Sequence, residues 1–150
     1  MTLEIDGKVV YFPRALNEIF GEWIEEVEFD GEMSYDEEEG IFTVSHGSFP
    51  IDGNDFEVIV QLNEPTAVFA VAARLHQPFS ELSDHKILEF LNRTNAGLYC
   101  GHFEKVGKHV RFKHSIDVEN GLLTGELLSN MIRAAMAACS ADFVAELKRQ

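Results

Sequence analysis

One seven-residue segment restricts the folds available to this chain more than any other. Residues 67–73 (AVFAVAA) are apolar at every position, and the Asn-Glu-Pro sequence shortly before them is typical of a turn. Read as a strand, this segment has apolar side chains on both of its faces. A strand of that kind is covered on both faces in folded proteins. We therefore expect residues 67–73 to lie inside a sheet, with other parts of the protein packed against each side.

Two further strands are expected before this one. Residues 41–46 carry Phe42 and Val44 in alternation with polar side chains. Residues 56–62 alternate in the same way, except that Ile59 falls on the otherwise polar side. Alternation with a period of two is typical of strands that turn one face to the core.

Three helices are predicted from apolar spacing and end signals. The first covers residues 13–27, the second covers residues 83–96 with Ser83 as its cap and Gly97 as its stop, and the third begins at Thr124 and continues as one long helix. The side chains expected to face the core are Leu16, Ile19, Phe20, Trp23, Ile24 and Val27 in the first helix, Ile87, Leu88, Phe90 and Leu91 in the second, and Leu128, Ile132, Ala135, Met136, Cys139, Phe143 and Leu147 in the third.

Two hairpins complete the pattern. The first is expected in residues 3–11 and the second in residues 98–118, where Phe103 would lie opposite Phe112. After the N-terminal hairpin the element order is α-β-β-β-α-β-β-α, without the βαβ alternation of a parallel sheet. This order predicts an α+β fold in which an antiparallel sheet of about five strands is packed by helices.

The net charge of −14 lies almost entirely in the first half of the chain. Residues 1–75 carry 17 acidic and 3 basic side chains, whereas residues 76–150 carry 9 of each. Such a surface repels phosphate backbones, so we expect no nucleic-acid partner, and a partner bound through charge would be basic. Residues 28–40 are expected to form a loop or a sheet edge that ends in the acidic turn 36–39 (DEEE), which could equally be a solvated charge run.

The sequence offers no sign of export or membrane insertion. Its start has neither the basic nor the apolar region of a signal peptide, and no apolar run approaches the ~20 residues of a membrane span. Cys100 and Cys139 are far apart and lack CxxC spacing, which favours reduced thiols in a cytoplasmic protein. We expect one cytoplasmic domain over residues 1–150, with no membrane partner.

No residue pattern marks an enzyme. Glycine-rich phosphate loops, the HExxH zinc motif and the GxSxG nucleophile motif are all missing. We therefore predict no catalytic residues, no cofactor and no metal site. The alternative is a small-molecule or metal-binding regulatory domain that uses Cys100, His102 and His114, although a metal would need a further ligand there.

Four short segments resemble a known family. They are residues 88–95 (LEFLNRTN), 101–104 (GHFE), 110–112 (VRF) and 123–124 (LT) before an Ala-rich helix. Together they resemble the YbjN-like family, described as regulators of bacterial sensory transduction, over approximately residues 13–147. The resemblance implies a fold similar to type III secretion chaperones. Proteins of that class are small, acidic, cytoplasmic homodimers that bind an unfolded segment of a secreted partner and have no catalytic residues.

From these observations we predict a non-enzymatic protein-interaction module, chaperone-like or regulatory, that binds a segment of a partner protein. A homodimer is also predicted, because three helices are expected to leave one sheet face uncovered within a single chain. On the strand 67–73 that face carries Val68, Ala70 and Ala72, and a two-fold contact would cover them with the same patch of a second chain. The alternative is a monomer in which the N-terminal hairpin or the final helix crosses this face.

Overall fold

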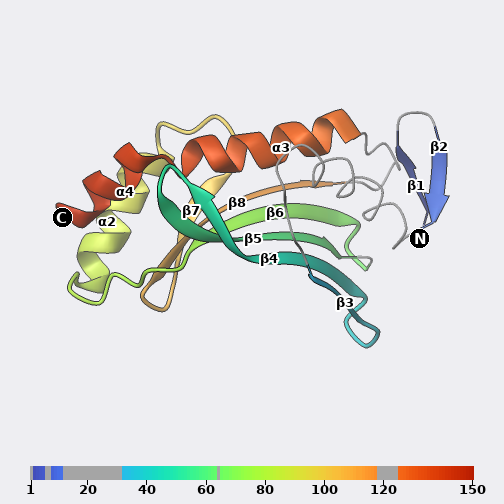
Figure 1. The fold of residues 1–150 in the computed structure, drawn as a ribbon, viewed down its shortest axis with the longest axis horizontal. Coiled ribbons are helices and arrows are strands. Elements are labelled where there is room, and N and C mark those ends of the chain that lie inside the picture. Colours follow the sequence, from blue (N-terminus) through green and yellow to red (C-terminus); the bar gives the residue numbers. More distant parts are fainter. Residues whose placement is uncertain (1, 6–7, 12–31, 64, 118–124) are drawn as a thin grey trace.

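The computed structural model describes residues 2–5, 8–11, 32–63, 65–117 and 125–150. Within them, six strands form an antiparallel sheet in the order β3-β4-β5-β6-β8-β7, and β1 and β2 form a separate two-stranded sheet (Figure 1). The strands are β1 (Thr2–Ile5), β2 (Lys8–Tyr11), β3 (Glu32–Asp36), β4 (Ile41–Ile51), β5 (Asn54–Asn63), β6 (Val68–Leu75), β7 (His102–Val106) and β8 (His109–Asp117). The helices are α2 (Asp84–Asn95), α3 (Gly125–Ala138) and α4 (Ala141–Lys148). None of these helices is long and apolar enough to span a bilayer.

The hydrophobic core lies between one face of the large sheet and the helices. Figure 1 shows α3 lying along this face, with α2 and α4 gathered at the end where β7 lies. Alternate side chains of each central strand point into this layer and are buried, as the sequence pattern predicts. The core side chains of β5 and β6 are Phe56, Val58, Val60, Leu62, Phe69, Val71, Ala73 and Leu75.

The predicted α+β class and antiparallel sheet are confirmed, and the sheet has one strand more than expected. Residues 32–36, expected to be loop or sheet edge, form the edge strand β3, which pairs with β4 from Glu32↔Ser45 to Asp36↔Ile41. Strand β4 also extends beyond His46, where the predicted strand ended. A shift of register between His46 and Phe49 carries Phe49 onto the core side.

The pairing of both predicted hairpins is confirmed, although the first strand of the second begins at His102 and not at residue 98 as expected. In the first, β1 and β2 pair from Thr2↔Tyr11 to Ile5↔Lys8. In the second, Phe103 lies opposite Phe112, and their rings meet edge to face at 5.3 Å between centroids.

The long C-terminal helix predicted from the sequence is wrong, because two helices take its place. The chain leaves helical geometry between Ala138 and Ala141. The Ser140 hydroxyl caps α4 by accepting from the Phe143 amide, and the Asp52 carboxylate accepts from the Ala141 amide at 3.2 Å. These two acceptors satisfy amides that an uninterrupted helix would bond to its own carbonyls.

Most of the predicted core positions in the helices are confirmed, and Leu88 is an exception. Ile87 and Leu91 of α2 are buried and Phe90 packs against the core, but the Leu88 side chain is 47% exposed. Its position next to Ile87 turns it toward solvent, since neighbours on a helix differ by about 100°. In α3, α4 and the turn between them the buried set is Met131, Ile132, Ala135, Cys139, Val144 and Leu147, with Met136 and Phe143 packed against it.

Several predictions fall outside the described residues. They are the helix 13–27 with Trp23 and the Thr124 start of the third helix, and the burial of the Leu128 side chain is likewise not described. The core position of Trp23 therefore stays a prediction from the sequence alone.

Candidate interaction surface

The second face of the large sheet is the candidate interaction surface, and we call it the open face. Among the described residues, no helix lies across it (Figure 1). Strand alternation places on it Glu32 and Ser34 of β3, Thr43 and Ser45 of β4, Glu57, Ile59 and Gln61 of β5, Val68, Ala70, Ala72 and Arg74 of β6, His102 and Glu104 of β7, and Arg111, Lys113 and Ser115 of β8.

The centre of the open face is a shallow hollow. Ala70 and Ala72 lie at its base, with only 7% and 8% of their surfaces exposed. Their longer neighbours on β5 and β8 form its rim and enclose a volume of about 90 Å³. The predicted interface residues Val68, Ala70 and Ala72 therefore do lie together on one face, and the two alanines are buried by neighbouring side chains.

Polar contacts fix several side chains around the hollow. Arg74 pairs with Glu57 at 2.6 Å, and Arg111 pairs with Glu104 at 2.5 Å. These pairs are partly exposed, so each contributes at most about 1 kcal/mol to folding. Within the described part of the chain, neither Glu32 nor Lys113 has an ion-pair partner.

The strand registers align these residues in one row across the sheet. From edge to edge the row reads Glu32, Ser45, Ile59, Ala72, Lys113 and His102. It begins with an acid, has an isoleucine near its middle, and ends with a lysine and a histidine. Ile59 stands out in the sequence of its strand, because it is an apolar side chain on an otherwise polar strand face.

The two edges of the sheet differ in their backbone partners. At the β7 edge the Asn95 side chain binds the backbone of Phe103 twice: its amide donates to the Phe103 carbonyl at 2.9 Å, and its oxygen accepts from the Phe103 amide at 2.7 Å. Asn95 thus occupies two of the backbone groups, both of Phe103, that an added strand would need at this edge. At the opposite edge, the described residues place no strand or side chain against the outer side of β3.

An acidic turn adjoins the β3 edge. The Asp36 carboxylate accepts from the amides of Glu38 and Glu39, both at 3.0 Å, and Gly40 closes the turn with a φ of 65°. The side chains of residues 36–39 are all exposed. The predicted acidic turn is therefore present, and it places four carboxylates beside a strand edge that no described residue pairs with.

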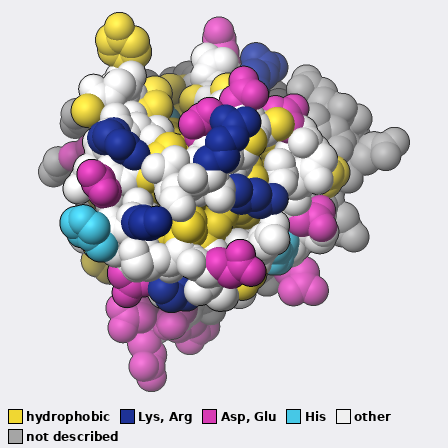
Figure 2. Space-filling view, turned by 90° about the vertical axis from the view of Figure 1, so that its left-hand side faces the viewer, with side chains coloured by type: hydrophobic (Ala, Val, Ile, Leu, Met, Phe, Trp, Pro, Cys, Tyr) yellow, Lys and Arg dark blue, Asp and Glu magenta, His cyan; other side chains and the backbone are white. Residues whose placement is uncertain are grey.

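The opposite end of the molecule is more basic. Figure 2 views the end where α2, α4 and β7 lie, and Lys and Arg side chains there are spread among apolar ones. They include the exposed side chains of Lys86, Arg93, Lys148 and Arg149. The elements at this end all belong to the second half of the sequence, which carries as many basic as acidic side chains.

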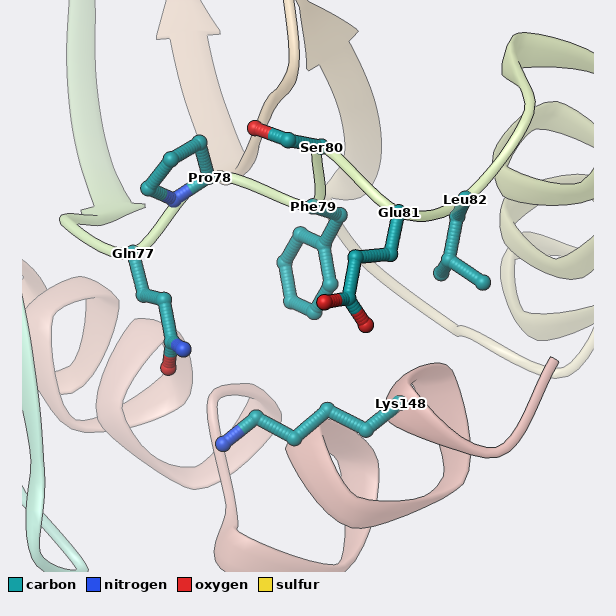
Figure 3. A pocket seen from close by; sticks show the side chains of 7 residues that line it. All are labelled: Gln77, Pro78, Phe79, Ser80, Glu81, Leu82 and Lys148. Carbon is teal, nitrogen blue, oxygen red and sulfur yellow. The ribbon is translucent and has the colours of Figure 1, made fainter.

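A larger hollow of about 380 Å³ lies at this basic end, between α4 and the loop that precedes α2 (Figure 3). Glu81 and Gln77 point from the loop toward the space beside Lys148 of α4. Lys108 holds the loop, because its carbonyl accepts from the Phe79 amide at 2.8 Å and its ammonium donates to the Leu82 carbonyl. Apart from Phe79 and Leu82, the side chains that line this hollow are exposed, which indicates a depression in the surface.

Among the ionisable groups of the described residues, two have clearly shifted pKa values. The hydrogen bond from Lys108, with the charge of Lys105, lowers the pKa of the exposed Asp84 carboxyl. Burial raises the pKa of the Cys139 thiol to about 12, so this thiol stays protonated and unreactive near neutral pH. Cys139 is therefore the small core residue that its place in the apolar stripe predicts.

The structure does not assemble the alternative metal site. Cys100 is exposed and lies before Gly101, whose φ of 70° keeps both residues outside β7. His102 lies on the open face, whereas His114 is on the core side of β8. Among the residues that the structure describes, no three His, Cys, Asp or Glu side chains form a group that could hold a metal.

Comparison with known proteins places these features in a family. The YbjN family model, described as "Putative bacterial sensory transduction regulator", matches residues 21–146.

The fold is similar to that of a chain in the HopA1–SchA chaperone–effector complex. The two chains are 11% identical, the match covers 90% of this chain and 94% of that chain, and the TM-score is 0.52. The crystal structure of YbjN from E. coli covers 79% of this chain and 82% of its own, with 11% identity and a TM-score of 0.45. A search of the curated proteins found no match. The fold is thus of the chaperone type that the resemblance implies, and because the family model spans most of its length, the chain belongs to the YbjN family.

Proposed function

We propose that the protein is a non-enzymatic interaction module, chaperone-like or regulatory, that binds an extended segment of a partner protein along β3. The observation that carries this proposal is the difference between the two sheet edges. At the β7 edge Asn95 occupies the outward backbone groups of Phe103, whereas no residue of the described chain bonds the outer side of β3. An unpaired edge recognises an extended peptide through backbone hydrogen bonds.

The chemistry around β3 favours a basic segment. Glu32, Asp36 and the three glutamates that follow are exposed around this edge. A second copy of β3 suits the edge poorly, because antiparallel self-pairing would bring Glu32 opposite Asp36, and like charges in that position are destabilising. A lysine- or arginine-containing segment meets the opposite charge and is also attracted over a distance of about 10 Å.

The comparisons support a role of this class. The solved structure with the similar fold contains a chaperone bound to its effector, and the family is described as a regulator of sensory transduction. Both descriptions fit a protein that acts by binding another protein.

The partner segment can be identified by position-specific crosslinking in the native host. We expect a photoreactive residue in place of Glu38 to capture a partner, and the same residue in place of Glu89 on α2 to capture none of it. Both positions are exposed, so they differ in location and hardly in access. The captured segment, sequenced by mass spectrometry, should be basic and free of predicted helix. Capture of the same partner at both positions, or of an acidic segment, would contradict the proposal.

We expect reversal of the acidic turn to weaken binding of that segment. Changing Asp36, Glu37, Glu38 and Glu39 together to Lys should slow association about ten-fold or more at low salt and flatten its salt dependence. The matched control changes Glu81, Glu89, Glu126 and Asp142 to Lys, which are exposed elsewhere and alter the net charge equally. Stopped-flow fluorescence with a synthetic peptide of the captured segment measures both. Equal slowing in the two variants would show that net charge alone, and not the turn, guides association.

We further propose that the protein is a homodimer in which a second copy covers the open face. Val68, Ala70 and Ala72 are the residues we assign to this contact. Light scattering after size exclusion at micromolar concentration should give twice the mass of one chain. Val68→Asp should reduce it to one chain while the thermal midpoint stays near that of the parent protein, because Val68 is only partly buried within the chain. A parent protein with the mass of one chain would refute the dimer.

A further inference from the structure

The alternation of side chains along β3 indicates which residues the partner segment must carry, and this inference rests on the proposed function. We propose that the segment has two basic residues four positions apart, one opposite Glu32 and the other opposite Asp36. The residue midway between them then lies opposite Ser34. This spacing is what the edge recognises, whereas the total charge of the segment guides its approach.

The spacing follows from the geometry of β3. Its pairing with β4 runs without a break from Glu32 to Asp36, so alternate side chains point to the same side of the sheet. Glu32, Ser34 and Asp36 share that side, and all three are exposed. A residue of an added strand points to the same side as the β3 residue opposite it. The two residues that meet Glu32 and Asp36 are therefore four apart, about 13 Å along the segment, in either chain direction.

The two carboxylates have no cation opposite them within the sheet. Their partners on β4 are Ser45 and Ile41, which carry no charge. In the part of the chain that the structure describes, neither Glu32 nor Asp36 forms an ion pair. Asp36 accepts both turn amides through Oδ1, and a carboxylate has a second oxygen for a further donor. A strand added to β3 is placed to supply a cation to each carboxylate.

A segment with the same charge but another spacing should bind less well. If its basic residues are three or five apart, one of them points to the other side of the sheet, away from its carboxylate. If they are two apart, one of them lies opposite the uncharged Ser34. Attraction over a distance depends on the number of charges and hardly on their spacing. Spacing therefore distinguishes pairing with β3 from general attraction by an acidic surface.

Crosslinking from Ser34 tests the spacing. We expect a photoreactive residue in place of Ser34 to capture the same partner as the one in place of Glu38. The partner residue to which it attaches should have Lys or Arg two positions before it and two positions after it, which mass spectrometry of the crosslinked peptide shows. Attachment to a residue without both basic neighbours would refute the spacing and leave the edge as the binding site. Capture from Glu38 but not from Ser34, or from neither, would refute the proposed function itself.

Charge exchange provides a second test, with a synthetic peptide of the captured segment. Glu32→Lys should raise the dissociation constant about five-fold at low salt, because an attraction becomes a repulsion. A peptide with Glu in place of the basic residue opposite position 32 should bind the Glu32→Lys protein to within about three-fold of the parent pair. The matched control is Glu38→Lys in the turn, whose loss the same peptide should not recover. Fluorescence anisotropy measures each pair.

Recovery in both variants, or in neither, would refute the placement of that basic residue opposite Glu32. Circular dichroism shows whether each variant keeps its fold. A Glu32→Lys protein that fails to fold is replaced by Glu32→Gln, for which we expect a loss of about two-fold. Neutralising the opposite residue of the peptide should then weaken binding to the parent protein but not to Glu32→Gln, and equal weakening of both would contradict the pairing.

Discussion

Gly101→Ala should destabilise the protein by about 2–4 kcal/mol, because the new methyl group has no space and the backbone is unfavourable for alanine. Gly101 has a φ of 70°, in the left-handed region. A Cβ atom there would overlap Cζ and Cε2 of Phe112 and would lie 3.0 Å from the Lys113 carbonyl oxygen. The Phe112 ring is 1% exposed and is held by the Phe103 ring, so it has little freedom to move away. Urea unfolding, monitored by circular dichroism, measures the loss.

Gly107→Ala is the matched control for this prediction. Gly107 has a similar φ of 63°, but a Cβ atom there would have no neighbour within 4 Å. Its substitution should therefore cost only the backbone strain, about 1–2 kcal/mol. Equal losses in the two variants would show that the contact with Phe112 is not the reason for glycine at position 101.

The second large effect is expected for Phe103→Ala, which should cost about 3–5 kcal/mol of folding free energy. The Phe103 ring stacks on Phe143 of α4 at 4.0 Å between centroids and meets Phe112 of β8 edge to face. Phe143 in turn lies 5.7 Å from the Phe90 ring of α2. Removing the ring therefore leaves a cavity where two helices and the β7–β8 hairpin meet.

Phe103→Leu provides the control, since it keeps most of the volume and should cost less than about 1.5 kcal/mol. Thermal unfolding followed by circular dichroism compares the two variants. A Phe103→Ala protein that is as stable as the Phe103→Leu protein would mean that the site collapses around the smaller side chain. The aromatic cluster would then contribute little to joining the helices to the hairpin.

Patterns within short stretches of sequence determined much of this fold. The alternation in residues 56–62 identified β5 and its buried side, and also singled out Ile59 on the open face. The Phe103↔Phe112 pairing followed from the two-residue turn at residues 107–108, because a tight turn fixes the register of both strands. The Ser83 cap was predictable for the same reason, since its hydroxyl accepts from an amide only three residues away.

Other features needed partners that are distant in the sequence. Strand β3 has few of the residues typical of strands, and it is ordered by backbone pairing with β4. Asn95 is the last residue of α2, where an asparagine often satisfies the helix end or the turn after it. Its two hydrogen bonds to Phe103 depend on how the helix docks against the sheet.

The division between sequence and tertiary structure is clearest at the end of α3. Residues 124–147 have an uninterrupted helical pattern, and this local periodicity determined by itself which side chains face the core. The break before α4 depends partly on Asp52, 89 residues earlier, whose carboxylate binds the Ala141 amide. A helical pattern reports only neighbours three or four positions apart. The tertiary structure decided where the helix ends, because the acceptor that replaces a helical hydrogen bond there comes from the turn between β4 and β5.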